Sequence, residues 1–172
     1  MKKILLCFLV SASLTACTNQ ETKTEAKTET TGSVTTTGPD VDLIKKSITA
    51  FADGDWATYA STYADTAKSY HNIWPSNTDT TVGVKIPVLI EGFKKQRELM
   101  DGKLTMGGTI FEVVTMPDGS KYGHVWVDFT WKNKKGEVGK SVLFDSYGIN
   151  KDGKISYEWP IYDTKDVVRL GN

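Results

Sequence analysis

Two aspartates in the second half of the chain, Asp128 and Asp145, are candidates for acid–base chemistry. Each lies in a run where polar and apolar residues alternate, which is typical of a strand. Asp128 has Trp126 beside it on the same strand face, and an aromatic neighbour that excludes water raises the pKa of a carboxyl group. Asp145 shares its face with Tyr147. If the strand register placed Asp145 opposite Asp128, the two like charges would raise one pKa further and create an acid–base pair.

The run that contains Asp128 has two faces of different character. The apolar face is expected in the core, and it consists of Gly123, Val125, Val127, Phe129 and Trp131. The mixed face consists of Tyr122, His124, Trp126, Asp128 and Thr130. This mixed face has two interpretations: it lines a pocket, or it is an outer surface that packs against a second copy of the chain.

Aromatic side chains around a pocket suit a flat, apolar ligand. The residues predicted to bind such a ligand are Trp74, Tyr122, His124, Trp126, Tyr147 and Tyr162. The residues in these strand runs that are predicted to be catalytic are Asp128 and Asp145.

Several other chemistries are not indicated by the sequence. The two histidines lie far apart and no cysteine pair has metal-ligand spacing, so no metal site is predicted. The chain has no glycine-rich phosphate loop and no Gly-x-Ser-x-Gly motif, and no cofactor is predicted. Its 21 basic residues balance 21 acidic ones, which argues against a nucleic-acid surface.

Helices are expected in the first half of the folded part. An apolar stripe at helical spacing runs from Val41 to Phe51, with Asp40 or Asp42 as a candidate cap. A second short helix is predicted from Trp56 to Tyr63, followed by a strand-like piece at 68–73. A third helix is predicted from a first-turn proline at position 87 to positions 101–102.

Strands are expected in the second half. Four runs, at 103–116, 120–132, 138–149 and 154–162, are separated by turns rich in glycine and asparagine. The pair Gly107-Gly108 is predicted to mark a kink or bulge. Helices followed by an antiparallel meander indicate a single α+β domain.

The N-terminus is predicted to carry a targeting signal. Lys2 and Lys3 precede an apolar run that is too short to span a bilayer, and Leu14-Thr15-Ala16-Cys17 follows. This pattern resembles the lipobox of a bacterial lipoprotein, which implies a signal peptide over 1–16 and a lipid such as palmitate on Cys17. Residues 17–39 are rich in threonine with alternating charges, and they are predicted to be a disordered tether.

The remaining chain, 40–172, resembles a known superfamily. The segment Ile48-Thr-Ala-Phe-Ala-Asp-Gly-Asp-Trp56, then Tyr63-Ala-Asp65, and Asp152-Gly-Lys-Ile155 before a last strand are similar to the nuclear transport factor 2-like superfamily, in its SnoaL-like (polyketide-cyclase-like) branch. The resemblance implies a cone-shaped, bent antiparallel sheet around three helices, with a pocket at its open end. It also places His71 where ketosteroid isomerases carry a general base, and it places Ser47 where they carry a tyrosine.

Three functions are compatible with these features. The favoured one is a lipid-anchored protein of the bacterial cell envelope, at the outer rather than the inner membrane, that binds a small apolar or amphipathic ligand in its cone pocket. The second is an acid–base enzyme (isomerase, cyclase or dehydratase) that uses His71 with Asp128 or Asp145. The third is a dimerisation or protein-interaction module with an exposed apolar sheet face.

Overall fold

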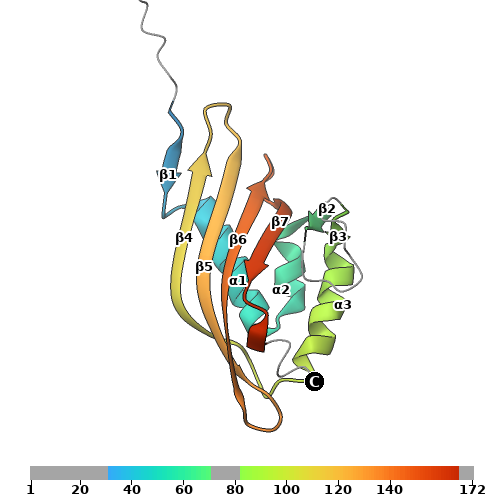
Figure 1. Ribbon diagram of the computed structural model, residues 1–172. Helices are drawn as coiled ribbons and strands as arrows, with labels where there is room; N and C mark the ends of the chain where they lie inside the picture. Colours follow the sequence, from blue (N-terminus) through green and yellow to red (C-terminus); the bar gives the residue numbers. More distant parts are fainter. Residues whose placement is uncertain (1–30, 71–81, 167–172) are drawn as a thin grey trace, which may run out of the picture. The chain divides into compact units, whose positions relative to one another are not determined.

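The computed structural model describes residues 31–70 and 82–166 (Figure 1). All of them belong to one compact unit, Thr31–Asn172. Three residues singled out above, Cys17, His71 and Trp74, lie outside the described residues.

Three helices form where the apolar periodicity predicts them. They are α1 (Pro39–Asp53), α2 (Trp56–Ser61) and α3 (Ile86–Arg97). The cap of α1 is Gly38 rather than Asp40 or Asp42, which lie in its first turn, because Pro39 already begins the helix. The expectations that α2 reaches Tyr63 and that α3 reaches 101–102 were wrong, since Tyr63 is the first residue of a strand and α3 ends at Arg97. Among the described helices, none is long and apolar enough to cross a membrane.

Seven strands form one mixed sheet. They are β1 (Ser33–Thr35), β2 (Tyr63–Ser69), β3 (Val84–Lys85), β4 (Thr105–Thr115), β5 (Lys121–Lys132), β6 (Val138–Ile149) and β7 (Ile155–Tyr162). The strand order is β1-β4-β5-β6-β7-β2-β3. All neighbouring strands are antiparallel except β2 and β7, which are parallel, so the expected antiparallel sheet is in fact mixed.

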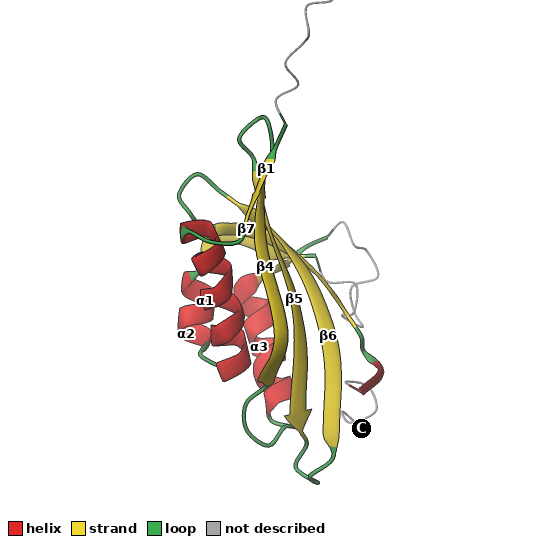
Figure 2. Ribbon diagram, turned by 90° about the vertical axis from the view of Figure 1, so that its left-hand side faces the viewer, coloured by secondary structure: helices red, strands yellow, loops and turns green. Residues whose placement is uncertain are grey.

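The three helices lie on one side of the sheet (Figure 2). We call the sheet face that packs against them the inner face, and the opposite one the outer face. On β5 the inner face is the apolar set predicted for the core, and Val125 and Val127 are at most 1% exposed. The α+β fold, with a bent sheet around three helices, is therefore confirmed.

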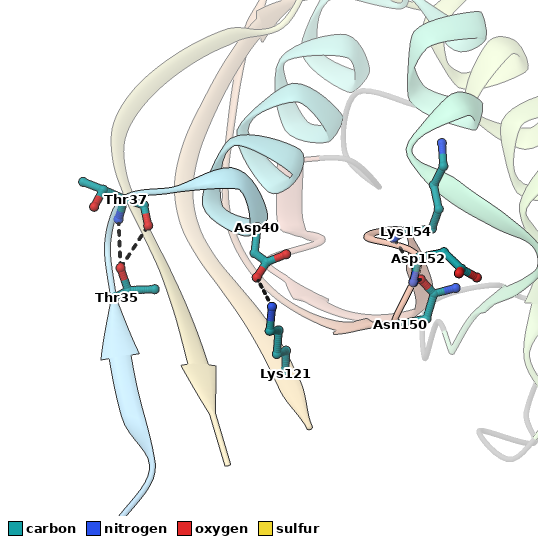
Figure 3. A network of polar contacts seen from close by, with 7 residues as sticks. All are labelled: Thr35, Thr37, Asp40, Lys121, Asn150, Asp152 and Lys154. Atoms are coloured by element: carbon teal, nitrogen blue, oxygen red, sulfur yellow. Dashed lines mark hydrogen bonds and ion pairs between the residues drawn. The ribbon is translucent and has the colours of Figure 1, made fainter. Parts of the chain in front are cut away.

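Local features bend the sheet and shape the turns between its strands. The register between β4 and β5 shifts between Met106 and Thr109, which confirms the bulge predicted at Gly107-Gly108. The β5–β6 turn contains Gly136 at a φ of 81°, a left-handed conformation that glycine adopts without steric cost. The last turn is fixed by Asn150, whose Oδ1 accepts hydrogen bonds from the backbone N–H of Asp152 (3.0 Å) and Lys154 (2.9 Å) (Figure 3).

Polar contacts also join the start of α1 to the sheet. The Nζ of Lys121, on β5, lies 2.6 Å from the Oδ2 of Asp40, on α1 (Figure 3). Strand β1 pairs with β4 through Ser33 opposite Thr115. Strand β1 lies inside the predicted tether at 17–39, but its three residues belong to the sheet. The part of the tether before position 31 lies outside the described residues.

Candidate ligand pocket

A pocket lies between the helices and the inner face of the sheet. Its cavity volume is about 80 Å3, which is space for a few water molecules or for part of a small ring compound. Its lining comes from all three helices, from the segment before β4, and from β5, β6 and β7: Ile48, Phe51, Tyr59, Phe93, Gln96, Arg97, Met100, Leu104, Phe129, Trp131, Ser141, Leu143, Asp145, Tyr147, Glu158, Pro160 and Tyr162.

One wall of the pocket is aromatic. The ring of Phe51, on α1, lies 4.9 Å from Phe93 on α3 and 5.8 Å from Phe129 on β5, centroid to centroid. Both contacts are edge-to-face, a geometry that aromatic pairs prefer. This wall suits an apolar ring.

Another part of the lining is polar and contains two buried carboxyl groups. Asp145 is 4% exposed and Glu158 is 2% exposed. In the antiparallel pair of β6 and β7, Asp145 lies opposite Pro160 and Tyr147 lies opposite Glu158. The two carboxyl residues therefore occupy diagonal positions on the inner face, within reach of each other.

Glu158 is held by two tyrosines, Tyr59 of α2 and Tyr63 at the start of β2. Its Oε2 accepts a hydrogen bond from the hydroxyl of Tyr59, at 3.1 Å, and another from the hydroxyl of Tyr63. The two hydroxyl oxygens lie 2.9 Å apart. Burial and then the charge of Glu158 raise the pKa of each tyrosine well above its usual value, so both remain neutral donors.

Asp145 is in a different environment. Burial, followed by the charge of Glu158, raises the pKa of Asp145 well above its usual value. Burial also raises the pKa of Glu158, but the hydrogen bonds from Tyr63 and Tyr59 oppose that rise. Two tyrosine hydroxyls stabilise the charge of Glu158, whereas Asp145 has, among the described residues, only the hydroxyl of Tyr147 as such a side-chain donor, so we assign the proton of the pair to Asp145.

One oxygen of Asp145 is unpartnered. Its Oδ1 is buried and has no hydrogen-bond partner among the described residues. A buried polar atom without a partner costs about 1–3 kcal/mol, and such an atom in a native fold calls for an explanation. Since Asp145 lines the cavity, a ligand in the cavity can supply the missing partner.

The predicted site residues divide between the two faces of the sheet. Asp145, Tyr147 and Tyr162 line the pocket. The structure places the mixed face of β5 on the outside, so none of its residues lines the pocket: Tyr122, His124, Trp126 and Asp128. Of the two interpretations of this face, the outer surface is the one that the structure shows. The catalytic and binding roles of all these residues stay predictions.

The expected pairing of Asp128 with Asp145 does not occur. Asp145 lies opposite Val125, whereas Asp128 lies opposite Val142. Positions 142 and 145 differ by an odd number, so their side chains point to opposite faces of β6. The partner of Asp145 is Glu158 instead.

Glu158, Tyr59 and Tyr63 were not among the predicted site residues. Tyr59 and Tyr63 are four residues apart, which is the spacing of a helix face and suggested core packing. Glu158 shares a strand face with Pro160 and Tyr162, and a charged residue on such a face is a weak signal of a buried site. No local pattern indicates that residues 59 and 158 come together.

The outer face carries an apolar row across four strands. Ile110, Trp126, Phe144 and Ile161 occupy successive paired positions on β4, β5, β6 and β7. Ile110 is 60% exposed and Ile161 is 52% exposed. Beside this row, the Nδ1 of His124 lies 3.2 Å from the Oε1 of Glu112.

Comparison with solved structures places this fold among known ones. PrhC from Penicillium brasilianum aligns with a TM-score of 0.61 and 13% identity, over 79% of this chain and 87% of that one. A putative SnoaL-like polyketide cyclase from Shewanella putrefaciens gives 0.55 and 8%, over 78% and 86%. An NTF2-like protein from Burkholderia xenovorans gives 0.54 and 15%, over 78% and 96%.

The chain therefore has the nuclear transport factor 2-like fold, of the kind seen in SnoaL-like proteins. At these identities, the similarity concerns the fold alone. The sequence itself matches no protein-family model and no curated protein.

Proposed function

We propose that this protein binds a small, flat, apolar or amphipathic ligand that places a neutral hydrogen-bond acceptor, such as a carbonyl oxygen, against Asp145. The observation that carries the proposal is the buried, unpartnered Oδ1 of Asp145 in a cavity with an aromatic wall. A protonated carboxyl group donates one hydrogen bond, and a carbonyl oxygen accepts it. The structural neighbours support the proposal, since they include proteins described as polyketide cyclases and as ketosteroid isomerase-like.

The test is a screen of ring ketones by thermal shift and native mass spectrometry. Simple aryl ketones such as 4-methylacetophenone are expected to raise the melting temperature and to appear as a bound mass. Asp145→Asn keeps a donor at this position and should retain binding, whereas Asp145→Ala should lose about tenfold or more in affinity. Asp128→Asn, on the outer face, is the matched control. Equal binding by all four proteins would contradict the proposal.

The second candidate function is acid–base catalysis on the same ligand class. It is favoured by the unequal environments of Asp145 and Glu158, since two titratable groups with separated pKa values are suited to acid and base roles. In an isomerisation, Asp145 would donate to the carbonyl oxygen while a base, for which His71 is the predicted residue, removes a proton from the neighbouring carbon.

Turnover would be visible in heavy water. An isomerase would introduce deuterium into the carbon skeleton of the ligand, and a dehydratase would return a product lighter by one water. His71→Ala and Asp145→Ala should each abolish the change while leaving a folded protein. A ligand that is returned unaltered by the wild type would favour a carrier function.

We propose further that the chain is a lipoprotein held at the bacterial outer membrane through Cys17. The support is the Leu14-Thr15-Ala16-Cys17 motif after a basic start and a short apolar run. Labelled palmitate should be incorporated by the wild type and not by Cys17→Ser, and the wild type should sediment with the outer-membrane fraction. Release of both proteins in soluble form would contradict this proposal.

We also propose a second copy of this chain as the partner of the outer face. Its exposed apolar row spans four strands, and apolar patches beyond about 300–600 Å2 mark interaction surfaces. A stable interface needs about 800 Å2 on each partner, an area that a four-stranded face can supply. Analytical ultracentrifugation should show a dimer that Trp126→Glu converts to a monomer. A wild-type monomer at high protein concentration would overturn the proposal.

A further inference from the structure

Arg97 is the basic residue of the pocket lining, and its position is fixed by contacts unrelated to any ligand. It is the last residue of α3. Its Nη2 donates hydrogen bonds to the backbone carbonyls of Phe51 (2.5 Å) and Ala52 (3.3 Å), near the C-terminus of α1. Its guanidinium also lies 5.4 Å from the ring centroid of Phe51 and 5.9 Å from that of Trp56.

The positive charge of Arg97 is not neutralised by a neighbouring carboxylate. Among the described residues, none places a carboxylate oxygen within 4.0 Å of this guanidinium, and the nearby Asp53 pairs with Lys103 at 2.9 Å instead. Burial lowers the pKa of Arg97 to about 10, and the charge of Asp53 opposes that shift. The side chain is therefore still a cation at neutral pH.

Arg97 also has hydrogen-bond donors left over. A guanidinium carries five N–H donors in a planar fork, and both hydrogen bonds that Arg97 makes to described residues leave from Nη2. Gln96, the preceding residue of α3, lines the same pocket and adds an amide. A planar, charged guanidinium whose position is fixed in this way matches the two oxygens of a carboxylate.

We propose that Arg97 binds a carboxylate of the ligand, so that the ligand is a small ring compound with an acid at one end and a neutral acceptor at the other. The inference rests on the proposed ligand-binding function and deepens it. In this arrangement the ring lies against Phe51 and Phe93, the carbonyl oxygen faces Asp145, and the carboxylate faces Arg97 and Gln96. The carboxylate cannot occupy the reverse position, because the charge of Glu158 next to Asp145 would repel it.

A purely structural role for Arg97 makes a different prediction. The hydrogen bonds to Phe51 and Ala52 stabilise the end of α1, and that contribution is independent of the charge of any ligand. Only a binding role makes the affinity of the pocket depend on whether the ligand carries a carboxylate.

The experiment therefore compares two ligands of the same shape, one with a carboxylate and one with a neutral carboxamide in its place. 4-Acetylbenzoate and 4-acetylbenzamide have the same ring and ketone, but only the first carries a carboxylate. Their dissociation constants are measured by NMR titration of backbone amides, for the wild type, Arg97→Met, Arg97→Lys and the control Lys94→Met. Lys94 lies on the same helix, is exposed, and pairs with Glu91 at 2.7 Å.

The wild type is expected to bind the acid about tenfold to a hundredfold more tightly than the amide, as a charge-assisted hydrogen bond does. This preference should vanish in Arg97→Met, shrink in Arg97→Lys, persist in Lys94→Met, and weaken with added salt in the wild type. The salt dependence of the wild type provides the test even if Arg97→Met is poorly folded.

Two outcomes would overturn the inference, and they are distinguishable. Equal binding of the two ligands by the wild type would overturn the proposed carboxylate site but would not contradict the proposed ligand-binding function. Binding of neither ligand, nor of the neutral ketones in the first screen, would overturn the proposed function together with this inference.

Discussion

The inner and outer faces of β5 and β6 alternate residue by residue along the same two strands, and they differ sharply in environment. On the inner face, Asp145 and Tyr147 are buried against the helices and the pocket. On the outer face, Trp126 is 38% exposed and Val142 is 55% exposed. Both faces carry aromatic and acidic residues, so residue type does not distinguish them. What distinguishes them is the layer of three helices that covers one and not the other.

The environments of the carboxyl groups also differ between the inner and outer faces. The carboxyl groups of the inner face are desolvated, and the pKa of Asp145 is raised well above its usual value by burial and by the charge of Glu158. On the outer face, Glu112 lies 3.2 Å from the imidazole of His124 where both side chains are partly open to solvent. A carboxyl group therefore becomes a candidate acid on one face and a surface ion-pair partner on the other.

The largest expected difference between the faces is in how much stability the protein loses when an aromatic side chain is truncated to alanine. Phe129→Ala, on the inner face, should lower the free energy of unfolding by about 3–5 kcal/mol, because it leaves a cavity among packed rings. Trp126→Ala, on the outer face, should cost about 1 kcal/mol in the monomer, since this ring already contacts water. Urea denaturation measures both. Equal losses at low protein concentration would contradict the assignment of the two faces.

A smaller difference in stability between the faces is expected when a glycine is replaced by alanine, which adds a methyl group. A Cβ at Gly123, on the inner face, would lie 2.0 Å from the Cδ1 of Ile44, which is 0% exposed and has no room to move. A Cβ at Gly148, on the outer face, would lie 2.2 Å from the ring of Tyr157, which is only partly buried. Gly123→Ala should therefore cost about 1–3 kcal/mol and Gly148→Ala clearly less. Thermal unfolding would show the reverse order if Ile44 had space to relax.

The pH dependence of stability should come from the inner face. Because the folded-state pKa of Asp145 is raised, the folded protein keeps a proton that the unfolded chain releases near pH 4. The folded state then binds more protons than the unfolded state above that pH, so the free energy of unfolding falls as the pH rises through the raised pKa. The slope is at most about 1.4 kcal/mol per pH unit for one proton.

Asp145→Asn should flatten this slope, and Asp128→Asn should leave it unchanged. Urea unfolding between pH 4.5 and 8 measures the effect in all three proteins. A slope that Asp145→Asn does not alter would mean that another group carries the pH dependence.

The smallest expected effect is that of the outer ion pair. Glu112→Gln should change the free energy of unfolding by less than about 1 kcal/mol, because partly exposed pairs gain little and are screened by salt. The difference from the wild type should disappear in high salt. The measurement is made at low protein concentration, where the chain is monomeric, and a loss of several kcal/mol there would contradict the partly exposed position of this pair.

The sequence by itself determined the order of the elements and the division of each strand into two faces. The stripe from Val41 to Phe51 predicts α1 because burial on one side requires helical spacing. The four strand runs were predicted to within a few residues at each end, since the turns between them need residues such as Gly136. The apolar set on β5 was correctly predicted to be core, because five apolar positions in alternation have no other stable placement.

Only the tertiary structure decided which residues share the pocket. Alternation separates Asp128 from Val127 but does not say which face the helices cover, and the mixed face of β5 proved to be the outer one. The register between strands is likewise set by pairing between residues that are distant in the sequence. The observed register places Glu158, rather than Asp128, beside Asp145. The contact between Tyr59 and Glu158 joins residues 99 positions apart. Local periodicity carries no information about such a contact, because it arises from how the helices pack on the sheet.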